Sequence, residues 1–290
     1  MNFLETLLNG LSSGGTYAMI ALGYTMVYGI AKMLNFAHGD VIMVGGYTLV
    51  VAMSAFGNPL LALLLAIVCC AVLGMTIEKL AYRPLRGASP LAVLITAIGM
   101  SYLLQSLAQI IFGAADKRVE LFDLGMITIG SLKISAYTLV TLACCTVIMA
   151  ALTLFVKFTR VGRAMIAVSE DKGAAQLMGI NVNFIITLTF AIGSALAAFA
   201  GFFMVLKDLP VNSTLGAMPG IKAFTAAVIG GIGSIPGAML GGILLGLVEA
   251  FSQTNAALAP YTIAIEFAIL IVILLVRPSG FLGKKRREKV

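Results

Sequence analysis

The chain has 290 residues, of which 60% are hydrophobic and only 11% are charged, whereas soluble domains carry about 25% charged residues. This composition excludes a soluble globular protein and indicates an all-α polytopic membrane protein, because backbone groups in lipid must be satisfied within helices or closed barrels. The formal net charge of +7 arises from lysines and arginines between and after the apolar segments, so it reports topology rather than nucleic-acid binding.

Eight segments are long and apolar enough to cross a bilayer as helices, because a span needs roughly 20 residues at ~1.5 Å rise each. They are residues 6–30, 34–55, 59–81, 90–112, 134–156, 184–206, 236–252 and 261–276. A ninth apolar segment, 220–233, would reach only ~21 Å as a helix. We expect it to enter the membrane and turn back near Gly233–Gly237, since irregular backbone at that depth is tolerated only inside protein or along a cavity.

Small residues recur four positions apart in several of these spans, and this spacing lets helix backbones approach closely. The pairs and triplets are Gly10 and Gly14, Gly193, Ala197 and Gly201, Gly237 and Gly241, and Gly242 and Gly246. The pattern predicts dense helix packing, and we also interpret it as support for a partner subunit in the membrane.

Two groups of residues, together with Glu266 of the last span, are candidates for a translocation pathway. The first opens the second span and contains Asn35, His38 and Asp40; we interpret Asn35 as a helix cap and Asp40 as a partner of the helix dipole, with a proton relay as the alternative. The second lies at the expected turn of the short segment. It consists of Gly230, Gly231, Gly233 and Pro236, a type of interruption that points to a transport path or to a packing kink.

Intramembrane carboxylates are few, so each deserves an interpretation. Glu249 and Glu266 lie in or near the last two spans, where they can face the bundle interior, pair with another subunit or hold an ammonium group. A position among lipid headgroups is an alternative for Glu249. In the fourth span, Ser101 and Gln105 form a polar stripe suited to hydrogen bonding across helices.

The segment from 157 to 183 is a polar, charged loop between two long apolar segments. A helix start is expected at Ser169, because Glu170 and Asp171 suit the positive end of a helix, and a helix stop is expected at Gly179. A short capped helix placed in water indicates a docking site for a soluble partner, with an ordinary solvated connector as the alternative.

Most lysines and arginines fall on one side of the predicted membrane, in the segments after spans one, three, five and eight. The other side carries Lys117, Arg118, Lys133, Lys207 and Lys222. The positive-inside rule therefore predicts an external N-terminus, with loop 157–183 and a basic tail, 277–290, in the cytoplasm. We expect that tail to face anionic lipid headgroups.

Motifs for nucleotide, metal or nucleophile chemistry are absent. There is no phosphate-binding G-x-x-x-x-G-K-[ST] sequence, and the four cysteines form two adjacent pairs rather than metal-binding spacings. We therefore predict no catalytic residue, no metal site and no cofactor on this chain, and we expect any energy source to lie on a partner or in an ion gradient.

Several long motifs, taken in order, resemble the permease subunit of bacterial branched-chain amino-acid ABC importers, the LivH type. They include N-G-L-S-S-G-G-T-Y-A-M-I at 9–20, L-N-F-A-H-G-D at 34–40, A-Y-R-P-L-R at 81–86 and R-V-G-R-A at 160–164. The most family-specific stretch is residues 222–239, K-A-F-T-A-A-V-I-G-G-I-G-S-I-P-G-A-M. The similarity runs nearly end to end, which implies one permease domain over 1–290 with a type II ABC importer-like fold.

The resemblance implies four kinds of partner: a second homologous permease subunit, two cytosolic ATPase subunits that hold ATP and Mg, a periplasmic substrate-binding protein, and the bilayer of the inner membrane. It also implies that the loop after the fifth span couples to the ATPases. The residues that fall in this coupling loop are Gly162, Arg163, Ala164, Glu170, Asp171, Ala174, Ala175 and Gly179. The short segment 113–133 is expected to face the binding protein.

The function expected from this resemblance is ATP-driven import of leucine, isoleucine and valine by alternating access. Import of other amino acids, short amides or aromatic acids is an open alternative, and so is pairing with a second copy of this chain. A proton-coupled secondary transporter would instead use His38, Asp40 or Glu266. A structural subunit that supports another pore-forming chain is a further alternative.

Overall fold

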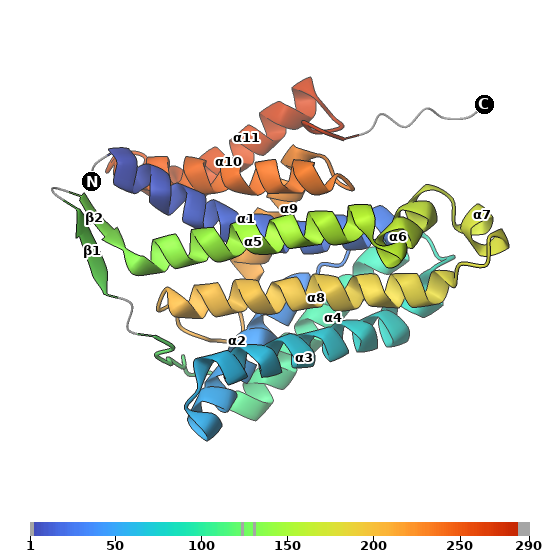
Figure 1. Cartoon of the computed structure of the whole chain (residues 1–290), viewed down its shortest axis with the longest axis horizontal. Helices are drawn as coiled ribbons and strands as arrows, with labels where there is room; N and C mark the ends of the chain where they lie inside the picture. Colours follow the sequence, from blue (N-terminus) through green and yellow to red (C-terminus); the bar gives the residue numbers. More distant parts are fainter. Residues whose placement is uncertain (1–2, 123–124, 130–131, 284–290) are drawn as a thin grey trace. The chain divides into compact units, whose positions relative to one another are not determined.

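Helices make up most of the chain in the computed structural model, which describes residues 3–122, 125–129 and 132–283 (Figure 1). The long helices are α1 (Phe3–Ala31), α2 (His38–Phe56), α3 (Pro59–Ile77), α4 (Pro90–Phe112), α5 (Ala136–Phe158), α8 (Val182–Leu206), α10 (Ile235–Thr254) and α11 (Thr262–Val276). The shorter ones are α6 (Arg160–Glu170), α7 (Lys172–Leu177) and α9 (Ala217–Gly230). Residues 284–290 of the predicted basic tail lie outside the described residues.

Within the described ranges, 7 helical segments are long and apolar enough to cross a membrane, and they match seven of the eight predicted spans. The first predicted span lies inside α1, a single helix of 29 residues. It is not among the seven, because serine, threonine, tyrosine and glycine residues lower its hydropathy. The short ninth segment is confirmed as α9, a helix of 14 residues. The all-α polytopic prediction is therefore confirmed.

Local sequence explains where several helices begin. The Asn58 side chain accepts hydrogen bonds from the backbone N–H groups of Leu60 and Leu61, at 3.0 and 3.2 Å, and caps α3. Ser89 caps α4 in the same way. A proline follows each cap in the first turn, where its missing N–H costs no helical hydrogen bond.

The third span continues past its predicted end at residue 81. A π-helical turn, η1 (Glu78–Tyr82), and a 3₁₀ turn, η2 (Arg83–Leu85), extend α3 without a break in the helical run. Wider π-helical turns often occur at functional sites. This turn brings Glu78 and Tyr82 into the interior of the chain.

A two-stranded hairpin, which the sequence reasoning did not predict, lies between α4 and α5. Strands β1 (Met126–Ile129) and β2 (Leu132–Ser135) pair antiparallel, with Met126 opposite Ser135 and Ile129 opposite Leu132. The alternation of apolar and polar residues around a Gly-Ser pair is the sequence pattern that could have indicated this hairpin. The predicted fifth span accordingly begins at Ala136 rather than at residue 134.

Backbone contacts divide the chain into two units. Unit 1 comprises Met1–Thr25, Leu124–Met149 and Lys222–Val290, and unit 2 comprises Met26–Asp123 and Ala150–Ile221. The boundaries fall within α1, α5 and α9, so each of these helices contributes residues to both units.

In unit 2, α2, α3 and α8 lie side by side and form the core (Figure 1). Close approach depends on small residues: a Cβ on Gly201 would lie 3.0 Å from the Ile42 carbonyl oxygen, and one on Gly45 would lie 3.3 Å from Cα of Ala198. Tyr47 stacks on Phe112 with ring centroids 4.2 Å apart. Of these three helices, α8 and α2 are the more deeply buried, whereas α3 leaves most of its residues exposed or half-buried.

In unit 1, α1 and α10 pack through the predicted small-residue pairs. A Cβ added to Gly246 would overlap the backbone of Gly14, and one added to Gly242 would overlap the backbone of Ala18. The prediction of dense packing is confirmed. These stripes are covered by helices of the chain itself, so they give no support for a partner subunit in the membrane.

Candidate functional site

The predicted coupling loop folds as two helices, α6 and α7. Thr159 caps α6, because its Oγ1 accepts a hydrogen bond of 2.9 Å from the backbone N–H of Gly162. One face of α6 is buried, and that face carries Gly162, Met165 and Val168. The sequence reasoning had expected a single short helix in this loop.

The expected helix start at Ser169 is wrong. Ser169 lies in the last turn of α6, where its hydroxyl donates to the carbonyl of Ile166 at 2.7 Å. The cap of α7 is Asp171, whose Oδ1 accepts from the backbone N–H groups of Gly173 and Ala174 at 2.8 and 3.0 Å. An aspartate is as good a cap as a serine. Capping preference therefore does not decide whether Ser169 or Asp171 starts the second helix.

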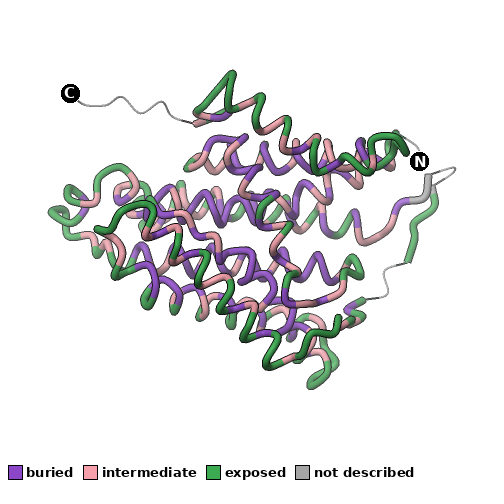
Figure 2. Tube along the Cα trace, turned by 180° about the vertical axis from the view of Figure 1, so that it is seen from behind, coloured by how far each residue is buried: buried purple, intermediate pink, exposed green. Residues whose placement is uncertain are grey.

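The expected helix stop at Gly179 is confirmed. Its φ of 80° is the left-handed conformation that glycine adopts readily, and the following N–H, of Ile180, bonds back to the carbonyl of Ala175 at 3.0 Å. The end of the helix leaves two large apolar side chains exposed to solvent. Leu177 is 90% exposed and Met178 is 82% exposed, within a segment that Figure 2 shows as mostly exposed.

The eight predicted coupling residues divide by burial. Arg163, Glu170, Asp171, Ala174 and Gly179 are exposed, Ala164 is half-buried, and Gly162 and Ala175 are buried. A Cβ on Gly162 would overlap the carbonyl oxygen of Val156, so this glycine lets α6 pack against the end of α5. Gly162 and Ala175 therefore hold the loop together, while the exposed members are available to a partner. The exposed Leu177 and Met178 were not among the predicted coupling residues.

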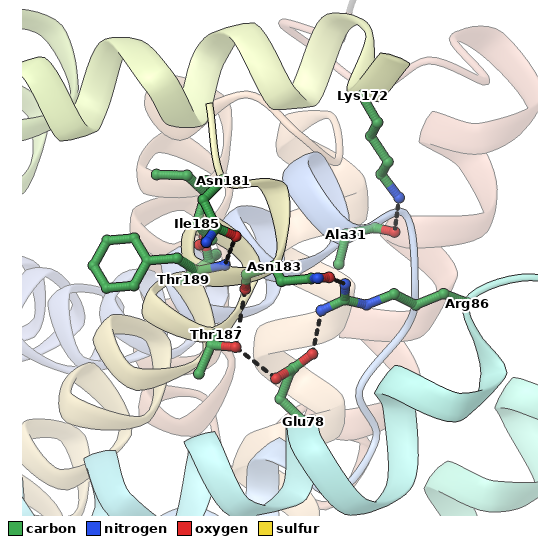
Figure 3. Close-up of polar contacts among 10 residues, drawn as sticks. Ala31, Glu78, Arg86, Lys172, Asn181, Asn183, Ile185, Thr187 and Thr189 are labelled. Carbon is green, nitrogen blue, oxygen red and sulfur yellow. Dashed lines mark hydrogen bonds and ion pairs between the residues drawn. The ribbon is translucent and has the colours of Figure 1, made fainter. Parts of the chain in front are cut away.

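A lysine in α7 ties the loop to the end of α1. The Lys172 ammonium donates a hydrogen bond of 2.9 Å to the carbonyl oxygen of Ala31, in the last turn of α1 (Figure 3). A cation suits the negative end of a helix. Burial lowers the pKa of Lys172, and the nearby charge of Arg86 lowers it further.

A second set of contacts ties the residues just after the loop to the end of α3 (Figure 3). Arg86 forms an ion pair with Glu78 and donates a hydrogen bond to the side chain of Asn183. Thr187 donates to the other carboxylate oxygen of Glu78 at 2.7 Å. Glu78 is fully buried, so its charge depends on these partners. The motif at 81–86 included Arg86, but no role had been predicted for it or for Glu78.

The polar residues at the start of α2 also meet partners within unit 2. Asn35 is not a helix cap: its Oδ1 accepts a hydrogen bond of 2.9 Å from the hydroxyl of Tyr82, and Ala37 occupies the cap position without a side-chain bond. Asp40 lies in the first turn as expected. Its Oδ1 accepts a hydrogen bond of 2.8 Å from Gln105, which confirms that the polar stripe of α4 bonds across helices.

His38 and Gly39 complete this region. His38 is buried, and its backbone N–H bonds to the carbonyl of Asn35 at 3.1 Å. A Cβ on Gly216 would overlap the carbonyl of Gly39, so backbone meets backbone at this point. The structure thus brings Asn35, His38 and Asp40 together at one helix start, in a setting of hydrogen bonds and close packing.

In unit 1, the turn between α9 and α10 places the predicted glycines in special conformations. Gly231 and Gly233 have φ values of 104° and 94°, which other residues adopt only with strain. A Cβ on Gly230 would overlap the carbonyl of Gly237. Pro236 lies in the first turn of α10. These residues close a tight hairpin between the two helices.

Glu249 and Glu266 hold an ammonium group, as one of the interpretations proposed, and it belongs to the chain's own Lys222. The Lys222 Nζ atom lies 2.6 Å from Oε1 of Glu249 and 3.1 Å from Oε1 of Glu266. Lys222 had been counted among the lysines on the outer side of the membrane, but its side chain is buried in this ion cluster. Glu249 thus has its ion-pair partner within the chain itself, and its depth in the membrane stays a prediction.

Within the described residues, seven helical segments are apolar and long enough to cross a membrane, and they are accompanied by a folded polar loop and by buried charges. These features define a multi-pass membrane protein. Its sequence matches the family model described as the permease component of branched-chain amino acid transport systems over residues 6–274. The chain belongs to this family, so it is a transport component rather than an enzyme.

Named relatives align with the chain from end to end. The high-affinity branched-chain amino acid transport system permease protein BraD of Pseudomonas aeruginosa is 44% identical, covering 100% of this chain and 98% of its own length. The corresponding protein LivH of Escherichia coli is 43% identical over 99% of this chain and 98% of its own length. A probable branched-chain amino acid permease of Methanocaldococcus jannaschii is 29% identical over 91% of this chain and 88% of its own length. No solved structure matches the chain.

Proposed function

We propose that this chain is the transmembrane permease subunit of an ATP-driven importer that moves leucine, isoleucine and valine into the cytoplasm by alternating access. The family and the names of the relatives support the substrate class. The observation that carries the ATP-driven part is the α6–α7 loop, which presents exposed apolar side chains on a polar, capped scaffold.

The docking face of this loop consists of Ala174, Leu177 and Met178, with the charged Glu170 and Asp171 beside them. All five are exposed. When a soluble partner covers large apolar side chains at the tip of a water-facing loop, their burial stabilises the complex. Methionine adapts its shape to a partner surface. The partner expected at this face is a cytosolic ATPase subunit, which would bind the ATP and Mg that this chain has no motif to hold.

Movement of the loop would reach the spans through the two polar connections described above. The Lys172 contact links α7 to the end of α1, and the Arg86 contacts link the start of α8 to the end of α3. Closure of the ATPase pair would shift the loop, the loop would shift the adjoining spans, and the pathway would open outward. Hydrolysis would return it to the inward-facing state.

The complete importer would contain a second homologous permease, two ATPase subunits and a periplasmic substrate-binding protein in the bacterial inner membrane. The N-terminus would lie outside and loop 157–183 in the cytoplasm, in keeping with the distribution of lysine and arginine. The candidate pathway residues are those around Asn35 and Asp40 and those of the α9–α10 turn. Tight recognition would rest with the binding protein, so related importers with other solutes differ mainly there.

Uptake of radiolabelled leucine into proteoliposomes tests this proposal. The chain is reconstituted with its membrane partner, its ATPases and its binding protein, and each component is omitted in turn. The proposal expects uptake only with ATP and with every component present. Hydrolysis stimulated by the loaded binding protein without leucine uptake would move the substrate to another solute. Uptake by this chain alone, driven by a proton gradient, would overturn the ATP-driven function.

A further inference from the structure

The ion cluster in unit 1 contains one basic side chain and two acidic ones. Lys222 on α9 faces two carboxylates, Glu249 on α10 and Glu266 on α11, and the ring of Tyr17 on α1 lies 5.6 Å from its ammonium nitrogen. Tyr17 is a neutral phenol. If both carboxylates were ionised, the cluster would carry one surplus negative charge.

A surplus charge at this position would be poorly solvated. The Lys222 side chain is 10% exposed and the Glu266 side chain only 2%, within helices that are otherwise apolar. Burial of a charge without a counter-charge is costly, and buried groups avoid that cost by changing their protonation state. An ionisable group inside a membrane protein is accordingly expected to be paired or neutral.

The geometry distinguishes the two carboxylates. Glu249 makes the shorter contact with Lys222, 2.6 Å against 3.1 Å, is more exposed at 15%, and also accepts from the Gln253 amide at 3.4 Å. Glu266 uses Oε1 for Lys222, while its Oε2 is buried and finds no hydrogen-bond partner among the described residues. An unpaired oxygen costs less free energy when it is neutral than when it carries charge.

We propose that Glu266 binds a proton at Oε2, so that the cluster consists of an ammonium on Lys222, a carboxylate on Glu249 and a neutral carboxylic acid on Glu266. The proton replaces the missing second cation. The neutral cluster joins α9, α10 and α11 at the end of the α9–α10 hairpin away from its glycine turn. This inference concerns the protonation of the chain itself and does not depend on which solute it carries.

Infrared spectroscopy of the purified, membrane-reconstituted protein tests the proposal, because a protonated carboxylic acid has a carbonyl band that a carboxylate lacks. At neutral pH the wild-type protein should show this band, and the difference spectrum against Glu266→Gln should show its loss. The amide of the variant is neutral and similar in shape, so the helices should pack as before.

Two conservative variants assign the band even if Glu266→Gln does not fold. Glu266→Asp should shift the frequency of the band, and the matched Glu249→Asp should leave it unchanged. A difference spectrum without a carboxylic acid band for Glu266→Gln, together with an unshifted band in Glu266→Asp, would overturn the proposal. A shift in Glu249→Asp alone would also overturn it, because the proton would then belong to the other carboxylate.

Discussion

Among the described residues, two buried ion clusters, one in each unit, show different uses of charge inside an apolar protein. In unit 2, Arg86 and Glu78 balance each other, and Thr187 and Asn183 occupy further hydrogen-bonding positions. In unit 1, Lys222 serves two carboxylates, and one oxygen of Glu266 has no partner among the described residues. A balanced cluster fixes the position of helices, whereas an unbalanced cluster also has to bind a proton.

Removal of Lys222 should give the largest loss of stability. Lys222→Met leaves Glu249 buried without a counter-charge, and breaking a buried pair in this way costs about 3–5 kcal/mol. Second substitutions in the Lys222→Met background distinguish the two carboxylates. Lys222→Met with Glu249→Gln should recover most of the loss, because the remaining Glu266 is neutral, whereas Lys222→Met with Glu266→Gln should not.

These variants are compared by their free energies of unfolding in the same lipid or detergent. Equal recovery in both double variants would contradict the difference that we assign to the two carboxylates. Full stability of Lys222→Met would show that the cluster contributes nothing to the fold.

Removal of Arg86 should give the next largest effect. Arg86→Met leaves the fully buried Glu78 with the Thr187 hydrogen bond, so we expect a loss of about 2–3 kcal/mol. The double variant Arg86→Met with Glu78→Gln should regain about half of it. Thermal unfolding measures the loss, and an unchanged stability in Arg86→Met would contradict a balanced pair.

The cap of α7 should have a smaller and local effect. Asp171→Ala removes the acceptor for the N–H groups of Gly173 and Ala174, which costs about 1 kcal/mol and should speed amide exchange about fivefold across Lys172–Leu177. Asp171→Asn is the matched control, since asparagine also caps helices. Exchange rates unchanged by the alanine variant would show that α7 does not depend on this cap.

The smallest effect on stability is expected at Ala174, which is exposed, in contrast to its buried neighbour Ala175. Ala174→Glu should change the free energy of unfolding by no more than about 0.5 kcal/mol. Ala175→Glu should cost several times that amount, because it buries a charge. Of these two alanines, only Ala174 therefore serves as a site for testing docking, and a similar loss of stability in both variants would contradict their placement.

The sequence predicted the features that depend on local pattern. Apolar length predicted the spans, and Gly179 predicted the end of α7. Glycines four apart predicted dense helix packing, although not that Gly246 would pack against Gly14. Each of these features is specified by residues within it or next to it, or by the missing side chain of a glycine.

Features that join distant segments could not be predicted in the same way. Lys222 on α9 and Glu266 on α11 lie 44 positions apart in the sequence, with α10 between them. No local pattern near either residue indicates the other as its partner. The same holds for Glu78 and Thr187. Asn35 and Ser169 were assigned as caps because both are good capping residues, yet Tyr82 binds the first, and the end of α6 includes the second.

The most direct test of the central claim is ATP-dependent leucine uptake by the variant Leu177→Ser with Met178→Ser, reconstituted with all partner subunits and compared with wild type. Both side chains are exposed, so unfolding stability should stay within about 0.5 kcal/mol and the binding protein should bind leucine as before. We expect uptake and its coupled ATP hydrolysis to fall together about tenfold or more, because loss of two apolar anchors removes about 2 kcal/mol of docking free energy. Uptake equal to that of wild type would contradict the proposal that the α6–α7 loop docks the ATPase.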